Sequence, residues 1–81
     1  MQESLFVIIS EVMDVPVGEI SMDSSPDTIG SWDSLNHMNL VFALEEEYGV
    51  KFSDETIVKM MDVETILGAL KELSSGAGDN A

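Results

Sequence analysis

Ser34 is the side chain with the clearest chemical use in this sequence, because it stands where an apolar periodic segment begins. The triplet Asp33-Ser34-Leu35 places its hydroxyl at the expected start of a helix. The backbone N–H groups at a helix start lack intrahelical partners, and the helix dipole places a partial positive charge there. Such a helix start suits a phosphate attached to the serine. The sequence therefore predicts a covalently modified serine in preference to a catalytic one.

Catalysis by the same serine is a weaker interpretation. Ser34 and His37 are three positions apart on an expected helix, so their side chains lie on neighbouring faces. A serine hydrolase needs the histidine to reach the serine, an orienting acid and an oxyanion hole. The sequence has no G-x-S-x-G nucleophile elbow, and Asp33 leaves the helix start in another direction. We therefore expect no enzymatic activity and no catalytic residues.

A calcium loop is a second interpretation that the residues do not support. Asp23, Ser25 and Asp27 have the alternating spacing that opens such a loop. Thr28 then stands where glycine is required, and Ser34 stands where a bidentate glutamate is required. We expect no specific metal site in this chain.

Composition describes one small acidic domain. The 81 residues are 44% hydrophobic, which allows a single core, and the formal net charge is −13 with three lysines and no arginine. Nucleic acid is an implausible partner because neutralising phosphates requires Lys and Arg, whereas basic protein partners are favoured. No segment has the features of a signal peptide or a membrane span. We expect a cytoplasmic monomer with no membrane insertion.

Apolar periodicity predicts an all-α fold, a small four-helix bundle. A long connection over 15–33, pinned by Ile20 and Ile29, leads the chain to Ser34. Val15-Pro16 ends the first helix and Gly49 ends the second. Residues 75–81 lack an apolar stripe and are expected to be a flexible tail after a domain over 1–74. The expected helices cover residues 2–14, 34–48, 54–60 and 63–74.

The second expected helix carries more apolar residues than one core needs. One stripe serves the core and consists of Leu40, Val41, Leu44 and Tyr48. The other stripe could be extra core or an exposed docking ridge, and consists of Leu35, Met38 and Phe42. The residues alone leave both interpretations open.

A family resemblance appears at this point. Trp32-Asp33-Ser34-Leu35, followed by Leu40-Val41-Phe42-Ala43-Leu44-Glu45-Glu46-Glu47-Tyr48-Gly49, resembles the acyl carrier proteins, and the resemblance runs from Leu5 to about Leu73. It implies three main helices and one short helix. It further implies that Ser34 receives 4′-phosphopantetheine from coenzyme A through a phosphopantetheinyl transferase. Acyl groups would then be held as thioesters on that arm and presented to acyl-loading and acyl-transferring enzymes.

The resemblance also implies residue roles. Asp33 would contact the transferase, and the docking ridge of Leu35, Met38 and Phe42 would face partner enzymes. Two acids would bind basic docking patches on those partners, namely Glu45 and Glu46. An acyl pocket between the helices would be formed by His37, Leu40, Leu44, Tyr48, Ile57, Met60 and Ile66.

Several positions depart from the family pattern, among them Gly30-Ser31-Trp32, where small residues are commoner in the family. Many carriers of fatty acid biosynthesis have acids where this chain has Asn36 and Asn39, so a dedicated lipid, polyketide or surface-glycan acylation route is expected. Trp32 is expected to close the loop over the core. A position beside the prosthetic arm is the weaker interpretation of this residue. Two alternatives stay open, an amino-acid (peptidyl or D-alanyl) carrier of the same fold and an unmodified acidic adaptor.

Overall fold

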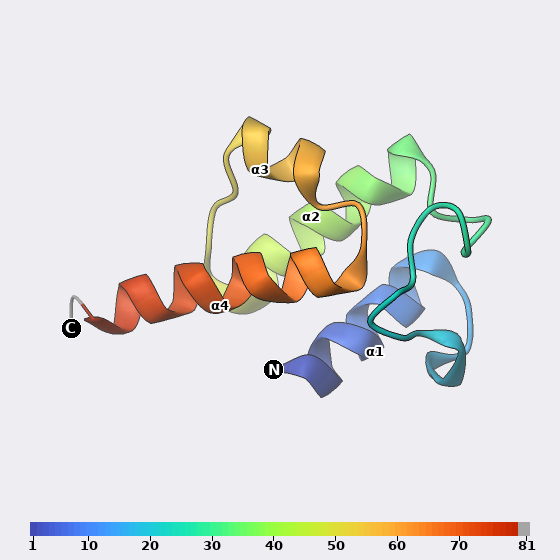
Figure 1. The fold of residues 1–81 in the computed structure, drawn as a ribbon, viewed down its shortest axis with the longest axis horizontal. Helices are drawn as coiled ribbons and strands as arrows, with labels where there is room; N and C mark the ends of the chain where they lie inside the picture. The colour runs from blue at the N-terminus through green and yellow to red at the C-terminus, as the bar shows by residue number, and fades with distance from the viewer. Residues whose placement is uncertain (80–81) are drawn as a thin grey trace.

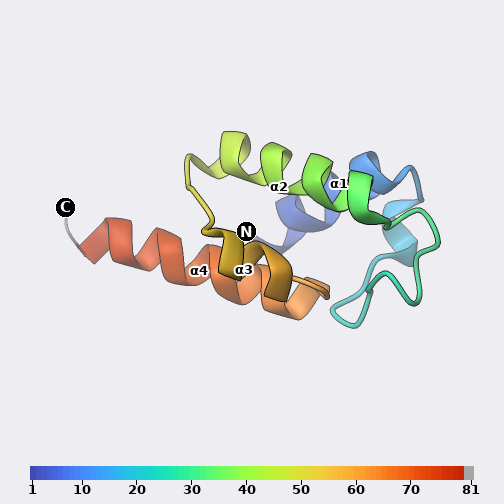
Figure 2. The same cartoon turned by 90° about the horizontal axis from the view of Figure 1, so that it is seen from above.

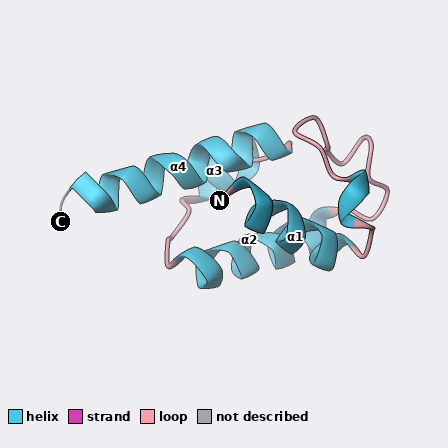
Figure 3. Cartoon of the chain, turned by 90° about the horizontal axis from the view of Figure 1, so that it is seen from below, coloured by secondary structure: helices cyan, strands magenta, loops and turns pink. Residues whose placement is uncertain are grey.

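The computed structural model of the protein describes the backbone of residues 1–79 and the side chains of residues 1–74. Within that part the chain forms only helices and loops (Figure 3). The helices are α1 (Gln2–Met13), the short 3-10 helix η1 (Val17–Glu19), α2 (Ser34–Tyr48), α3 (Asp54–Lys59) and α4 (Val63–Asp79). This confirms the predicted all-α class with three main helices and one short one.

The bounds of α2 are those that the sequence predicts. The helix begins at Ser34 because the side chain of Asp33 accepts a hydrogen bond from the backbone N–H of Asn36 at 2.9 Å. It ends at Gly49, which has a left-handed φ of 63° and whose N–H bonds the carbonyl of Glu45. A residue with a side chain is strained in that conformation, so glycine is the natural terminator here.

The end of α1 differs slightly from the expectation. The helix stops at Met13, and Asp14 takes a left-handed conformation with φ 58°, its N–H bonded to the carbonyl of Ser10. Aspartate is one of the few residues with a side chain that visits this region. Pro16 therefore follows a helix that has already ended.

The later helices begin as expected, but α4 runs further. Ser53 caps α3 by accepting from the N–H of Thr56, and Asp62 accepts from the N–H of Thr65 at 2.7 Å in front of α4. The prediction that the fourth helix ends near residue 74 is wrong, since α4 extends to Asp79. No proline interrupts its ladder there. The predicted domain boundary at residue 74 stays a prediction, and the last two residues of the expected tail lie outside the described residues.

The first long loop lies at one end of the molecule, beside the starts of α2 and α4, while the C-terminal part of α4 extends past the bundle at the other end (Figures 1 and 2). Two loop carbonyls, those of Ser24 and Met22, accept hydrogen bonds from the N–H groups of Val63 and Glu64, each at 3.1 Å. These donors at the start of α4 would otherwise lack partners. The loop is thereby fixed to α4.

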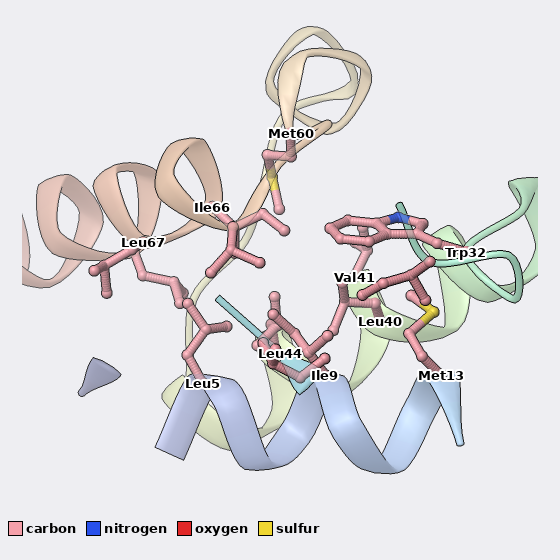
Figure 4. Packing of buried hydrophobic residues seen from close by; sticks show 14 of the residues in the cluster. Leu5, Ile9, Met13, Trp32, Leu40, Val41, Leu44, Met60, Ile66 and Leu67 are labelled. Carbon is pink, nitrogen blue, oxygen red and sulfur yellow. The ribbon is translucent and has the colours of Figure 1, made fainter. Parts of the chain in front are cut away.

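A single core joins the helices and the loop (Figure 4). Ile20 and Ile29 are buried as predicted, and Trp32 is only 2% exposed, which confirms that it packs over the core. The predicted core stripe of α2 is also confirmed, with Leu40, Val41 and Leu44 buried. The other buried apolar residues are Leu5, Ile9, Met13, Phe52, Met60, Val63, Ile66, Leu67 and Leu70.

Candidate functional site

Ser34 is the first residue of α2 and is exposed, so its hydroxyl meets the main requirement of a modification site. The residues before it are held by polar contacts. The side chain of Asn36 donates to the carbonyl of Ser31 at 2.8 Å, and the Ser31 hydroxyl donates to the carbonyl of Met13 at 2.6 Å. Together with the cap by Asp33, these bonds fix the loop to both α1 and α2 immediately ahead of the serine.

An open groove of about 590 Å³ lies beside the serine. Its size falls within the range of about 300–1,000 Å³ that small-molecule sites occupy. Apolar side chains from the loop, α2 and α3 dominate its walls. The groove is lined by Pro26, Trp32, Asp33, Ser34, His37, Met38, Ile57, Val58 and Met61. An exposed hydroxyl at a helix N-terminus, with an apolar groove beside it, fits a phosphate that leads into an extended arm.

The seven residues predicted for the acyl pocket do not line one cavity. His37 and Ile57 line the groove at Ser34. Tyr48, the last residue of α2, is half-buried and its hydroxyl bonds that of Ser4. The other four are fully buried in the core, namely Leu40, Leu44, Met60 and Ile66. An acyl pocket at these positions therefore stays a prediction.

His37 is placed to hold structure and not to activate Ser34. Its Nδ1 accepts a hydrogen bond from the indole N–H of Trp32 at 3.0 Å, and its Nε2 lies 2.9 Å from the carbonyl of Ile57. An indole nitrogen can only donate, so Nδ1 is the acceptor and Nε2 carries the proton that bonds Ile57. Both ring nitrogens are engaged, which leaves neither to take a proton from the serine.

The second apolar stripe of α2, which the resemblance assigns to docking, forms a largely exposed ridge at the surface. Leu35 is 72% exposed, Phe42 is 60% exposed and Met38 is half-buried. The short helix α3 adds Val58 at 73% exposure, and Met61 follows just after that helix; the sequence pattern predicts neither residue. A six-residue helix has too few turns to show an apolar stripe, so only the groove reveals their place beside Ser34.

The two acids assigned to docking differ in environment. Glu46 is exposed, whereas Glu45 is half-buried and its Oε2 accepts a hydrogen bond from the N–H of Phe52 at 2.9 Å. Glu45 thus holds the connection between α2 and α3. Its position late in α2 offers no favourable interaction with the helix dipole, and this bond supplies a local reason for the acid.

The fold and the site together define a small helical carrier domain with an exposed serine for a phosphate-linked arm. A family model described as the phosphopantetheine attachment site matches residues 3–70. The chain belongs to the phosphopantetheine-binding acyl carrier protein family.

Individual relatives agree with this assignment. An acyl carrier protein of Clostridium acetobutylicum is 35% identical over 65 residues, covering 79% of this chain and 83% of that protein. One of Petrotoga mobilis is 33% identical over 70 residues, covering 86% and 82%. The solution structure of a holo acyl carrier protein from Geobacter metallireducens superposes with a TM-score of 0.87 at 26% identity, covering 99% of this chain and 92% of that one.

Family membership establishes the class of activity. The protein is a carrier of acyl groups bound through phosphopantetheine and has no catalytic reaction of its own. Its family interacts with phosphopantetheinyl transferases and with enzymes that process acyl groups. Within residues 1–79, the helices lack the length and apolarity needed to cross a membrane.

Proposed function

We propose that Ser34 is the residue that receives 4′-phosphopantetheine. The observation that carries this assignment is the exposed hydroxyl at the first residue of α2, beside an apolar groove. When bound, the arm supplies a terminal thiol on which an acyl group travels as a thioester, in a chain that has no cysteine.

The chain's own residues position that hydroxyl and present it to partners. Asp33 fixes the first turn of α2, whose partial positive charge favours a phosphodiester at Ser34. The docking ridge of Leu35, Met38 and Phe42 offers apolar contact on the same helix. The net charge of −13 draws basic surfaces towards the protein and speeds their encounter. A cytoplasmic monomer that docks on basic patches through the ridge and Glu46 accounts for these features.

Incubation with coenzyme A, Mg²⁺ and a broad-specificity transferase tests the attachment, with intact mass and peptide mapping as readouts. Wild-type protein gains one arm, mapped to Ser34, and Ser34→Ala gains none. Ser4→Ala is the matched control, because Ser4 also stands in the first turn of an exposed helix start. Loss of the arm in the control, or an arm retained by Ser34→Ala, refutes the assignment.

A dedicated acylation route, for a lipid, polyketide or surface glycan, is the second part of the proposal. It rests on Asn36 and Asn39, which make the surface beside Ser34 less acidic than in many carriers of fatty acid biosynthesis. Asn36 is part of the local structure, since its amide donates to the Ser31 carbonyl and a carboxylate could not do so.

Acyl transfer by an enzyme of general fatty acid biosynthesis tests this route. We expect holo wild-type protein to be a poor acceptor and Asn39→Glu to improve kcat/KM by about threefold at low salt, with the gain lost at high salt. Ser74→Glu is the control for added charge far from the site. Efficient transfer to wild-type protein contradicts a dedicated route.

A further inference from the structure

A chain of hydrogen bonds crosses the floor of the Ser34 groove. The indole N–H of Trp32 donates to Nδ1 of His37, and Nε2 of His37 donates to the carbonyl of Ile57. Ile57 lies in the last turn of α3, and its carbonyl also accepts a hydrogen bond from the backbone N–H of Met60 at 3.3 Å. This bridge of Trp32, His37 and Ile57 therefore ties the first loop, α2 and α3 together at one point.

The bridge separates the groove from the core. Trp32 and His37 are the most buried of the groove's lining residues, whereas Val58 and Met61 on its rim are exposed. Figure 4 shows the indole within the core cluster, on the side of Met13. The two rings are stacked, with centroids 6.2 Å apart and planes 21° from parallel. An acyl chain that leaves Ser34 meets this pair before it reaches the core.

Passage into the core requires the bridge to open. The indole would have to move and its N–H would lose its partner, whereas the Ile57 carbonyl would lose His37 and keep the N–H of Met60. Leaving a buried polar group without a partner destabilises the fold by more than a hydrogen bond normally contributes. Within the described side chains, every buried nitrogen and oxygen has a partner, so none is free to replace His37. The outer groove, in contrast, is open without any rearrangement.

Building on the proposed attachment at Ser34, we propose that this bridge restricts the carrier to short acyl groups. Short cargo stays in the outer groove, between the docking ridge and α3, and does not enter the bundle. His37 is the specificity-determining position, because its ring links the Trp32 indole to the Ile57 carbonyl. Long fatty chains are not the cargo that this interior accommodates.

The test compares the full chain loaded with acetyl and with octanoyl pantetheine arms from the corresponding coenzyme A thioesters. Hydroxylamine cleavage of the thioester reports its exposure, and methyl NMR signals of Leu44 and Ile66 report entry into the core. In wild-type protein we expect cleavage rates equal within about twofold, and unchanged methyl signals, because both chains stay outside.

Two variants at His37 extend the comparison. In His37→Ala the octanoyl thioester should be cleaved about tenfold more slowly than the acetyl one, because the longer chain now shelters in the bundle. His37→Gln should behave as wild type, since its amide can accept from Trp32 and donate to Ile57.

The outcomes are distinguishable. Protection of octanoyl in wild-type protein, or a shift of the core methyl signals, overturns the restriction, as does a folded His37→Ala that gains no protection. If His37→Ala does not fold, the wild-type NMR comparison decides alone. A protein that takes no arm at Ser34 overturns the attachment proposal together with this inference, whereas an armed protein that shelters octanoyl overturns this inference only.

Discussion

Replacing His37 with alanine should destabilise the fold strongly, because the imidazole is the shared partner of Trp32 and Ile57. Loss of the hydrogen bond to the Ile57 carbonyl costs about 1 kcal/mol net. The Ile57 carbonyl keeps the N–H of Met60 as a partner at 3.3 Å, but Trp32 is only 2% exposed. Its N–H stays buried without a partner, at a cost of about 1–3 kcal/mol.

We therefore expect the free energy of unfolding to fall by about 2–4 kcal/mol, out of the total of about 4–12 kcal/mol that is usual for a domain of this size. Urea titration followed by circular dichroism measures the loss. The corresponding fall in Tm is about 10–30 °C. His37→Gln should recover most of the lost stability, because its amide offers one acceptor and one donor to the same partners.

A double-mutant cycle isolates the bond between the two rings. Trp32→Phe removes the indole N–H and also leaves a cavity, so the destabilisation caused by this variant alone does not measure the hydrogen bond. In the background of His37→Ala the N–H has already lost its partner, and the two changes should cost about 1–2 kcal/mol less together than their separate effects predict. Additive effects within about 0.3 kcal/mol, or a His37→Ala protein as stable as wild type, would refute the reasoning.

Three further predictions concern the docking ridge and two helix ends. Phe42→Ala should change the free energy of unfolding by less than about 0.5 kcal/mol, because the ring is 60% exposed. The same variant should bind the transferase about tenfold more weakly, as measured by calorimetry. Equal losses of folding and binding free energy would contradict an exposed ridge. Gly49→Ala should lower the free energy of unfolding in urea by about 1 kcal/mol, because φ is 63°. No atom lies within 4 Å of an added Cβ, so backbone strain and not a clash would cause the loss. An unchanged free energy of unfolding would contradict this strain. Hydrogen bonds from the Thr65 hydroxyl and N–H lower the pKa of Asp62 below its ordinary 3.8. The stability that Asp62 contributes is thus present above that value and is lost as pH falls through the lowered pKa. Asp62→Asn should therefore make the free energy of unfolding less dependent on pH below about pH 4, by a few tenths of a kcal/mol because the group is largely exposed. An unchanged pH dependence would contradict this prediction.

Local signals explain how much of the fold the sequence predicts. Asp33 and Gly49 bound α2 because one side chain can accept from a free N–H and the other residue can adopt a positive φ. Asp14 takes the left-handed conformation at the end of α1 that glycine usually takes. A single aspartate in the sequence does not predict such a helix end. The continuation of α4 to Asp79 lacks an apolar stripe, so periodicity places the end too early.

The candidate site is predictable only in part, because several of its contacts join distant segments. Ser34 and the docking ridge follow from spacing along one helix. The bond from His37 to Ile57 depends on where α3 packs, and that packing is a property of the whole fold. The same holds for Glu45, whose partner Phe52 lies beyond a turn, so the acid is assigned to docking although one oxygen holds the backbone.

Polar contacts, together with the burial of Trp32, position the functional end of this protein. Leu35 and Phe42 are exposed, as their proposed docking role requires, so they do not anchor the helix start. Besides the buried Trp32, hydrogen bonds order the loop before Ser34, from Asn36 to the Ser31 carbonyl and from Ser31 to the Met13 carbonyl. Such bonds fix the backbone without covering the serine, whereas apolar packing at the same place would bury the hydroxyl that a transferase has to reach. An exposed reactive group on a small domain thus depends on a polar framework around it, and loosening that framework should impair modification before it unfolds the core.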